Sequence, residues 1–124
     1  MLLKISYLGL VGVSRKHGYR DSVNLEEELI KSFADRGTAD LFHGISSAAA
    51  RRIPADLRRR ALRKLDVLNA ATTLEDLRVP PSNHLEKLSG ALAGHRSLRI
   101  SGKWRLVFRW QRGDAFAVRI VDYH

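Results

Sequence analysis

Residues 104–110 alternate between large apolar side chains and basic or smaller ones, and this alternation constrains the fold more than any other feature. The apolar positions are Trp104, Leu106, Phe108 and Trp110, and between them stand Arg105, Val107 and Arg109. Successive side chains of a strand point to opposite faces, so the pattern predicts a strand with one buried face and one arginine-bearing face. Sheets that are buried on one face only are typically antiparallel. The segment therefore predicts an antiparallel sheet.

Neighbouring segments supply the other strands of this sheet. We expect strands over residues 85–88, 96–100, 103–110 and 115–123. Turn residues separate the last three of them, at Ser101-Gly102 and at Arg112-Gly113-Asp114, as in hairpin connections. The second half of the domain is therefore predicted to be an antiparallel meander.

Helical spacing replaces the period of two in the first half of the domain. Apolar side chains recur along one helix face at Leu57, Ala61, Leu65 and Leu68, which predicts a helix that opens at Pro54. We also expect a strand over 29–33, a short helix over 38–42 that ends at Gly44, and a capped turn that starts near Thr73. Together these elements predict an α+β fold, in which an N-terminal strand and helices pack on a twisted antiparallel sheet.

Positive charge is carried by only part of the 124-residue chain. Residues 1–28 contain four basic and four acidic side chains, so the whole net charge of +9 lies on residues 29–124. A domain so basic favours a polyanionic partner: RNA, DNA, an anionic membrane or an acidic protein segment. The alternative is a basic surface that serves only solubility.

Residues 1–28 are interpreted as an N-terminal extension, and residues 29–124 as the domain. The extension ends in the acidic run Glu26-Glu27-Glu28 and shows no clear hydrophobic period. Two interpretations stay open: part of it adds a strand to a sheet edge, or it derives from a start codon set too far upstream.

The apolar start of the extension is interrupted by Lys4 and lacks a cleavage site, so no signal peptide is indicated. No stretch reaches the roughly 20 apolar residues of a membrane span. We expect a cytoplasmic protein without membrane contact.

The sequence lacks the common catalytic signatures. It has no P-loop, no G-x-S-x-G, no G-x-G-x-x-G and no H-E-x-x-H motif. Cysteine is absent and the five histidines show no close pairing, so neither a metal site nor another cofactor is expected. What remains is a basic strand face, Arg99, Arg105 and Arg109, beside the C-terminal Asp122-Tyr123-His124.

These residue types are sufficient for RNA cleavage without a metal. A base must remove the proton of a 2′-OH, an acid must protonate the leaving 5′ oxygen, and cations must stabilise the charge on phosphorus. Histidine can transfer a proton near neutral pH, whereas arginine stays charged and can pair with phosphate. A solvated terminus and a solvated sheet face would have the same composition, so the residue types alone predict only a basic, nucleic-acid-binding α+β domain.

Several blocks of residues 29–124 resemble the HigB-type plasmid-maintenance killer family of RelE-like toxins. In chain order they are IKSF at 30–33, GT at 37–38, LF at 41–42, RKLD at 63–66, LNAA at 68–71, LEDLRVPP at 74–81, SLRI at 97–100, WRLVFRW at 104–110, GDA at 113–115 and IVDYH at 120–124. The resemblance implies a compact RelE-like domain that cuts translated mRNA in the ribosomal A site by attack of a 2′-OH. It also implies a cognate HigA-like antitoxin with a helix-turn-helix domain, through which alone the toxin would reach operator DNA.

Site residues follow from the resemblance and from the charge pattern. The resemblance implies active-site roles for Asp122, Tyr123 and His124, with Arg105 as the cation at the phosphate. The candidate contacts to RNA or the ribosome are Arg99, Arg109, Lys87, His84, Arg58, Arg59, Arg60, Arg63 and Lys64. Two positions depart from the family pattern: Ser89 stands where many relatives have lysine, and Glu86 where some have histidine.

Three functions from different classes stay open at this stage. The first is the ribosome-dependent mRNA endonuclease. The second is a toxin of the same fold that acts without cutting RNA, such as a gyrase poison. The third is a binding protein that keeps contacts with an antitoxin or the ribosome after losing catalysis. The terminal His124 favours the first, because a protein that only binds has little use for it.

Overall fold

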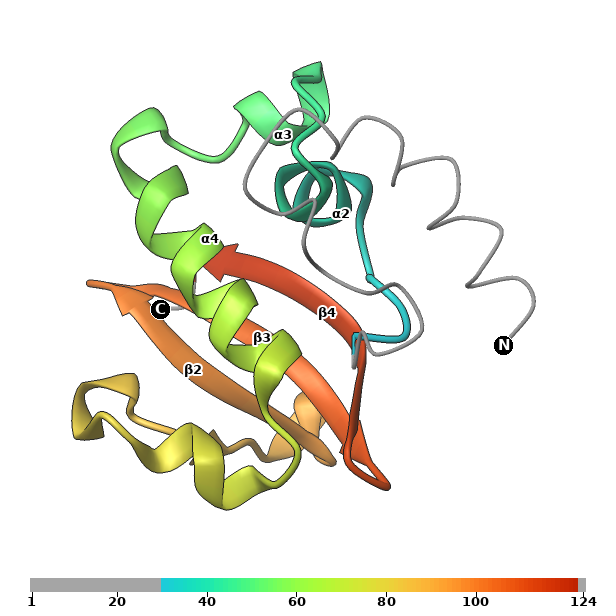
Figure 1. The fold of residues 1–124 in the computed structure, drawn as a ribbon, viewed down its shortest axis with the longest axis vertical. Coiled ribbons are helices and arrows are strands. Elements are labelled where there is room, and N and C mark those ends of the chain that lie inside the picture. The colour runs from blue at the N-terminus through green and yellow to red at the C-terminus, as the bar shows by residue number, and fades with distance from the viewer. Residues whose placement is uncertain (1–29, 123–124) are drawn as a thin grey trace.

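Among residues 30–122, which the computed structural model describes, the strands form one antiparallel sheet in the order β1-β2-β3-β4. The strands are β1 (Glu86–Lys87), β2 (His95–Ser101), β3 (Trp104–Gln111) and β4 (Asp114–Asp122). Each strand therefore pairs with its neighbours in sequence, and the α-helices precede the sheet along the chain (Figure 1). This arrangement confirms the expected α+β meander.

Two local features shape the hairpin of β3 and β4. Gln111 pairs with Asp114, and the two residues between them, Arg112 and Gly113, have φ angles of 54° and 82°. Positive φ at both turn residues is what a two-residue type I′ hairpin requires. Further along, the register shifts between Val107 and Arg109, and Ala117 has a φ of 52°. These values indicate a β-bulge at Ala117 in β4.

One long helix, α4 (Ala55–Ala70), lies over the sheet (Figure 1). Its buried residues are Leu57, Ala61, Leu65 and Leu68, the four positions of the expected stripe. They pack in one core with Leu98, Leu106 and Phe108 of the sheet, all fully buried. Burial of a leucine side chain contributes about 1.5–3 kcal/mol, so this contact fixes which sheet face points inward.

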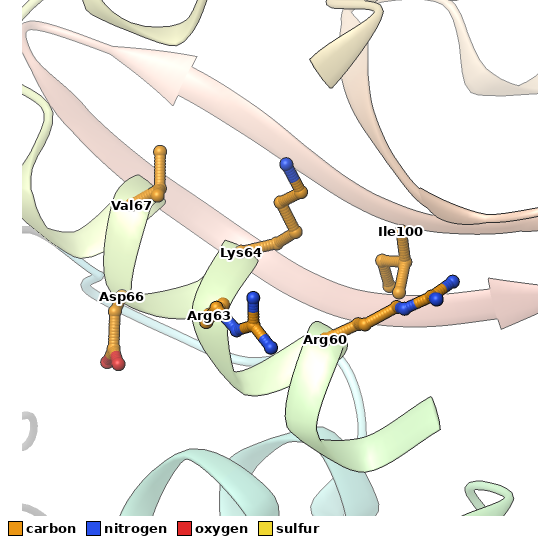
Figure 2. Close-up of a pocket in the computed structure, with 6 residues that line it drawn as sticks. All are labelled: Arg60, Arg63, Lys64, Asp66, Val67 and Ile100. Carbon is orange, nitrogen blue, oxygen red and sulfur yellow. The ribbon is translucent and has the colours of Figure 1, made fainter. Parts of the chain in front are cut away.

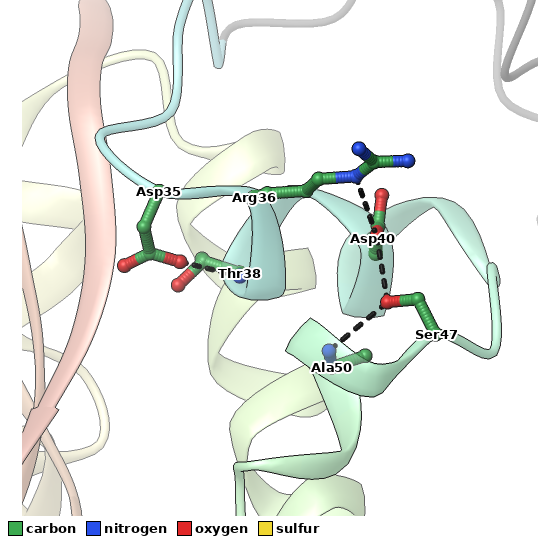
Figure 3. A network of polar contacts seen from close by, with 6 residues as sticks. All are labelled: Asp35, Arg36, Thr38, Asp40, Ser47 and Ala50. Atoms are coloured by element: carbon green, nitrogen blue, oxygen red, sulfur yellow. Dashed lines mark hydrogen bonds and ion pairs between the residues drawn. The ribbon is translucent and has the colours of Figure 1, made fainter.

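Two short helices, α2 (Arg36–His43) and α3 (Ala48–Arg51), are joined by a polar network (Figure 3). Asp35 caps α2 by accepting a hydrogen bond from the Thr38 backbone at 2.7 Å, and Ser47 caps α3 through the Ala50 backbone at 3.0 Å. Ser47 also donates to the buried Asp40 at 2.7 Å. Because the Ser47 hydroxyl serves both the cap and Asp40, it ties the two helices together.

Three 3₁₀ helices, η3 (Leu74–Arg78), η4 (Pro81–Asn83) and η5 (Gly90–Leu92), complete the connection from α4 to β2. The expected cap at Thr73 is confirmed as a capping box with Asp76. Hydrogen bonds from the backbone N–H groups of Thr72 and Thr73 lower the pKa of the Asp76 carboxyl. The charged carboxylate is the form that accepts these bonds.

The structure differs from the sequence prediction at several elements. The segment expected as a strand over 29–33 makes two isolated parallel bridges to β4, Ile30 with Ala115 and Phe33 with Val118; residue 29 lies outside the described part. A regular ladder is interrupted there because the Ala117 N–H at the bulge bonds the Ser32 hydroxyl instead. Pro54 is the N-cap of α4, and the first helical residue is Ala55. The expected strand over 85–88 is only two residues long, and α3 was not expected.

Gly37 should resist substitution because α2 and α3 approach closely there. A Cβ at this position would lie 2.6 Å from the carbonyl oxygen of Ala49. We expect Gly37→Ala to lower the free energy of unfolding by about 1–3 kcal/mol, the range for overpacking. Helix propensity alone would raise stability by up to about 1 kcal/mol. Urea denaturation that shows an unchanged or more stable variant would contradict the close contact.

Candidate nucleic-acid interface

The strand register gathers arginines on the face of the sheet that points away from α4. Arg99 of β2 pairs with Arg105 of β3, and Val107 of β3 pairs with Arg119 of β4. Directly opposed residues of antiparallel strands share a face. We call Arg99, Arg105, Arg109 and Arg119 the arginine face. The expected separation of an apolar and a basic face is confirmed for β3.

Two small side chains form the floor of the arginine face. Ser97 and Val107 are paired across β2 and β3, and both are fully buried. Arg99 and Arg109 are exposed, whereas Arg105 and Arg119 are half-buried. The arginine face therefore has a dry centre surrounded by longer cationic side chains.

Arg105 is the most constrained of these cations. Its side chain is only 11% exposed. Nε donates to the Ser97 hydroxyl at 2.7 Å, and Nη2 donates to the backbone carbonyl of His84, also at 2.7 Å. Nη2 also lies 3.4 Å from a carboxylate oxygen of Glu86. Within residues 30–122 these contacts use Nε and Nη2, so Nη1 is the nitrogen left to contact a ligand.

Glu86 is the acidic member of this neighbourhood. It pairs with Ser97 in register, which puts it in the row that continues to Val107 and Arg119. Its side chain is 53% exposed, and an ion pair this accessible to water is weak. A phosphate group can therefore compete with Glu86 for the Arg105 guanidinium.

Two predicted contacts lie on β1 or just before it. His84 is exposed and has a φ of 44°, a left-handed conformation in which its carbonyl oxygen accepts from Arg105. Lys87 is exposed but pairs with Arg96, which itself pairs with the buried Phe108. By register, Lys87 therefore belongs to the α4 side of the sheet, and the structure does not bring it together with Arg105.

The predicted cations of α4 lie on the other side of the sheet from the arginine face. Arg60, Arg63 and Lys64 line an open groove with Asp66, Val67 and Ile100 (Figure 2). Arg60 extends past Ile100 and donates to the Ser101 hydroxyl at 2.8 Å. The structure thus divides the predicted binding residues between two surfaces.

Two of the α4 cations, Arg58 and Lys64, form hydrogen bonds to segments outside the helix. Arg58 donates through Nε to the Ile53 carbonyl at 2.8 Å and through Nη2 to the Arg51 carbonyl at 3.1 Å, next to the end of α3. Lys64 donates to the side chain of the fully buried Asn83. Partial burial of Lys64, followed by the positive charge of Arg63, lowers the pKa of its ammonium group. Arg59, Arg60 and Arg63 are the exposed cations of this helix.

The C-terminal candidates are only partly within the described residues. Asp122 is exposed at the end of β4 and pairs with Trp104, one position beyond the pair of Arg105 with Val121. Tyr123 and His124 lie outside the described residues. Because Trp104 packs against the core, Asp122 belongs by register to the α4 side of the sheet, so the structure does not bring it together with Arg105.

Sequence reasoning missed several residues around the arginine face. Ser97 orients Arg105, Arg119 is a member of the face that pairs with Val107, and His95 and Phe116 both pair with Arg109. The alternation of β2 contains a signal for Ser97 and His95, because they stand two and four residues before Arg99. Arg119 and Phe116 are three apart, and only the bulge in β4 puts both on one face.

Between residues 30 and 122, no group of three or more His, Cys, Asp or Glu residues is arranged to hold a metal ion. None of the helices in that range has the length and apolar content needed to span a bilayer.

Comparison with known proteins identifies relatives over this domain. Residues 31–124 match the family described as the RelE-like toxin of type II toxin–antitoxin system HigB. Toxin HigB-1 of Vibrio cholerae serotype O1 is 43% identical over 65 residues, which cover 52% of this chain and 68% of that protein. Endoribonuclease HigB of Proteus vulgaris is 31% identical over 97 residues, 77% of this chain and 100% of that protein. An uncharacterized protein of Haemophilus influenzae is 35% identical over 63 residues, 51% of this chain and 62% of that protein.

Arg58 and Arg59 offer a matched test of structural against exposed cations. Both are arginines of α4, but only Arg58 bonds backbone carbonyls. We expect Arg58→Ala to lower the free energy of unfolding by about 1–3 kcal/mol, and Arg59→Ala to change it by less than about 0.5 kcal/mol. Denaturant melts of the two variants provide the measurement. Equal stabilities would show that the Arg58 contacts are energetically neutral.

Proposed function

Because the chain belongs to the HigB-like family of RelE-like toxins, we propose that it is an endoribonuclease that cleaves translated mRNA in the ribosomal A site. It is a toxin of a type II toxin–antitoxin system, and its partner is a cognate antitoxin. The nuclease activity is proposed because the chain aligns with the whole length of a relative that is named as an endoribonuclease. The family match from residue 31 supports residues 29–124 as the toxin domain and residues 1–28 as an extension outside it.

The reaction proposed is an attack of the ribose 2′-OH on the adjacent phosphorus. The bond from the 2′ oxygen to phosphorus forms while the bond from phosphorus to the 5′ oxygen breaks. A base accepts the 2′-OH proton and an acid supplies a proton to the leaving 5′ oxygen. The products are a 2′,3′-cyclic phosphate and a 5′-OH, so neither a redox step nor a co-reactant is needed.

Arg105 is proposed to stabilise the charge that develops on the phosphate. Its Nε bond to Ser97 and its Nη2 bond to the His84 carbonyl hold the guanidinium in one orientation. A donor that is already oriented and shielded from water stabilises a transition state without reorganising. Arginine also matches phosphate oxygens geometrically, which a lysine does not. Arg99 and Arg109, exposed on the same face, are proposed to neutralise neighbouring phosphates.

The proton transfers are assigned to the chain end. We propose that His124 exchanges a proton with the reacting oxygens, since imidazole titrates near neutral pH. Tyr123 would stack on a base or act as the second acid or base. Asp122 would set the orientation or the pKa of His124. The family match, which extends to residue 124, supports this assignment, whereas by register Asp122 itself lies on the α4 side of the sheet.

A second surface is proposed to bind the ribosome. Arg59, Arg60 and Arg63 are exposed on α4, on the side of the sheet away from the arginine face. Two cationic surfaces would let the domain lie between mRNA on one side and ribosomal RNA on the other. Binding through phosphates should weaken steeply as the salt concentration rises.

The cognate antitoxin is proposed to be HigA-like, with a helix-turn-helix domain that brings the complex to operator DNA. The toxin is proposed to act in the cytoplasm.

His124 should be the most sensitive catalytic position. Replacement by Gln keeps size and polarity but removes proton exchange, which is worth about 10²–10⁴-fold in rate. The measurement is single-turnover cleavage of A-site mRNA on programmed ribosomes, with thermal melting as the control for folding. A folded His124→Gln protein that cuts as fast as wild type would rule out this active site. Growth arrest with intact transcripts would instead favour a toxin that does not cut RNA.

A further inference from the structure

A row of three residues crosses the sheet at the opposite end of the arginine face from Arg99 and Arg105. His95 of β2 pairs with Arg109 of β3, and Arg109 pairs with Phe116 of β4. An exposed cation thus stands between two half-buried rings. Of these three, only Arg109 has a role in the proposed reaction.

The core contacts show on which face this row lies. Ala115 and Trp110, which precede Phe116 and follow Arg109, pair with each other and belong to the core on the α4 side. Alternation therefore directs Phe116 and Arg109 to the opposite face. Phe116 is not part of the core cluster. The ring consequently belongs to the arginine face, where packing against α4 cannot explain it.

The imidazole of His95 is held in place at the edge of this row. Its Nδ1 lies 3.2 Å from the carbonyl oxygen of Leu92 in η5, so Nδ1 donates in this contact. A ring that is anchored through one nitrogen loses little freedom when a flat ligand covers it. The row therefore combines an anchored imidazole and a half-buried phenyl ring with a planar guanidinium.

We propose that His95, Arg109 and Phe116 form a binding site for one unpaired RNA base and its phosphate, next to the cleaved position. The inference rests on the proposed function, because it treats the arginine face as the path of single-stranded mRNA. Arg109 stands four residues from Arg105 on β3, a distance of roughly 13 Å along a strand. At that distance the row serves a flanking nucleotide and leaves the scissile phosphate to Arg105.

Charge and shape favour RNA over other occupants of this face. The arginine face carries four arginines, and among the described residues of its rows Glu86 is the acidic side chain that opposes them. Unpaired bases stack on aromatic rings and on guanidinium planes, while the backbone phosphates bind cations. An acidic protein segment would match the charge, but carboxylate side chains do not stack on the rings of His95 and Phe116. The site is therefore specific for an unpaired base beside a phosphate.

Phe116→Leu tests the site because leucine keeps apolar bulk but offers no aromatic face. Phe33→Leu is the matched control, since Phe33 is also half-buried but packs with Phe42 in the core. We expect Phe116→Leu to slow single-turnover cleavage on programmed ribosomes roughly 5- to 100-fold, as for loss of one base stack. Phe33→Leu, if melting shows it to be folded, should cut at the wild-type rate. Equal rates for the two folded variants would overturn the site.

An abasic nucleotide in the mRNA identifies the base that stacks. Removal of the flanking base that Phe116 contacts should slow cleavage by the wild-type protein by the same factor as Phe116→Leu does. On that abasic mRNA, Phe116→Leu should cause no further decrease in the cleavage rate, as in a double-mutant cycle. Removal of the flanking base on the other side of the cut should leave the effect of Phe116→Leu intact. An effect of Phe116→Leu that is the same on every abasic mRNA would contradict stacking.

A binding measurement separates this inference from the endonuclease proposal. A fluorescein-labelled single-stranded RNA oligonucleotide is titrated with the full chain at several salt concentrations. Phe116→Leu should weaken binding at every concentration without changing the salt slope, whereas Arg109→Gln should reduce the slope by about 0.7, for one phosphate contact. Equal RNA affinity of wild type and Phe116→Leu would overturn the site. If Phe116→Leu weakens RNA binding but the wild-type protein cuts no mRNA, the endonuclease proposal is disproved and the base-binding site stands.

Discussion

Helix α4 buries its leucine stripe against Leu98, Leu106 and Phe108, and this contact determines what the other face of the sheet presents. Side chains alternate along a strand, so a register slip of one residue would turn Leu106 outward and Arg105 into the core. The free energy of burying these leucines therefore also holds the arginines on the outer face. The catalytic surface proposed for this toxin is in this sense a consequence of core packing.

Arg105 shows how the fold prepares a cation for a phosphate. The Ser97 hydroxyl and the His84 carbonyl restrict the guanidinium, and Val107 beside it excludes water from the floor. Glu86 lies close enough to compensate part of the charge but is too exposed to bind it tightly. Glu86 stands where the family pattern has histidine in some members, and here its carboxylate oxygen lies 3.4 Å from Nη2 of Arg105.

The sequence allowed the meander, the α4 stripe and the arginine-bearing strand to be predicted, because each depends on periodicity within one segment. It did not reveal that Arg58 and Lys64 hold α3 and η4, since those contacts depend on loops that fold back on α4. Lys87 was predicted to contact RNA together with Arg99 and Arg109, but its pairing with Arg96 puts it on the α4 side of the sheet. Phe116 and Arg119 escaped notice because a bulge breaks the period of two in β4.

The proposed mechanism depends on an oriented Arg105 that stabilises the reacting phosphate. Arg105→Lys tests it most directly, because the charge stays while the guanidinium that Ser97 and the His84 carbonyl orient is lost. The measurement is the single-turnover cleavage rate on programmed ribosomes at saturating toxin, with melting as the control for folding. The account predicts a fall of about 10²–10³-fold, the loss seen when one oriented donor to a transition state is removed. A folded Arg105→Lys protein that cuts at the wild-type rate would contradict it.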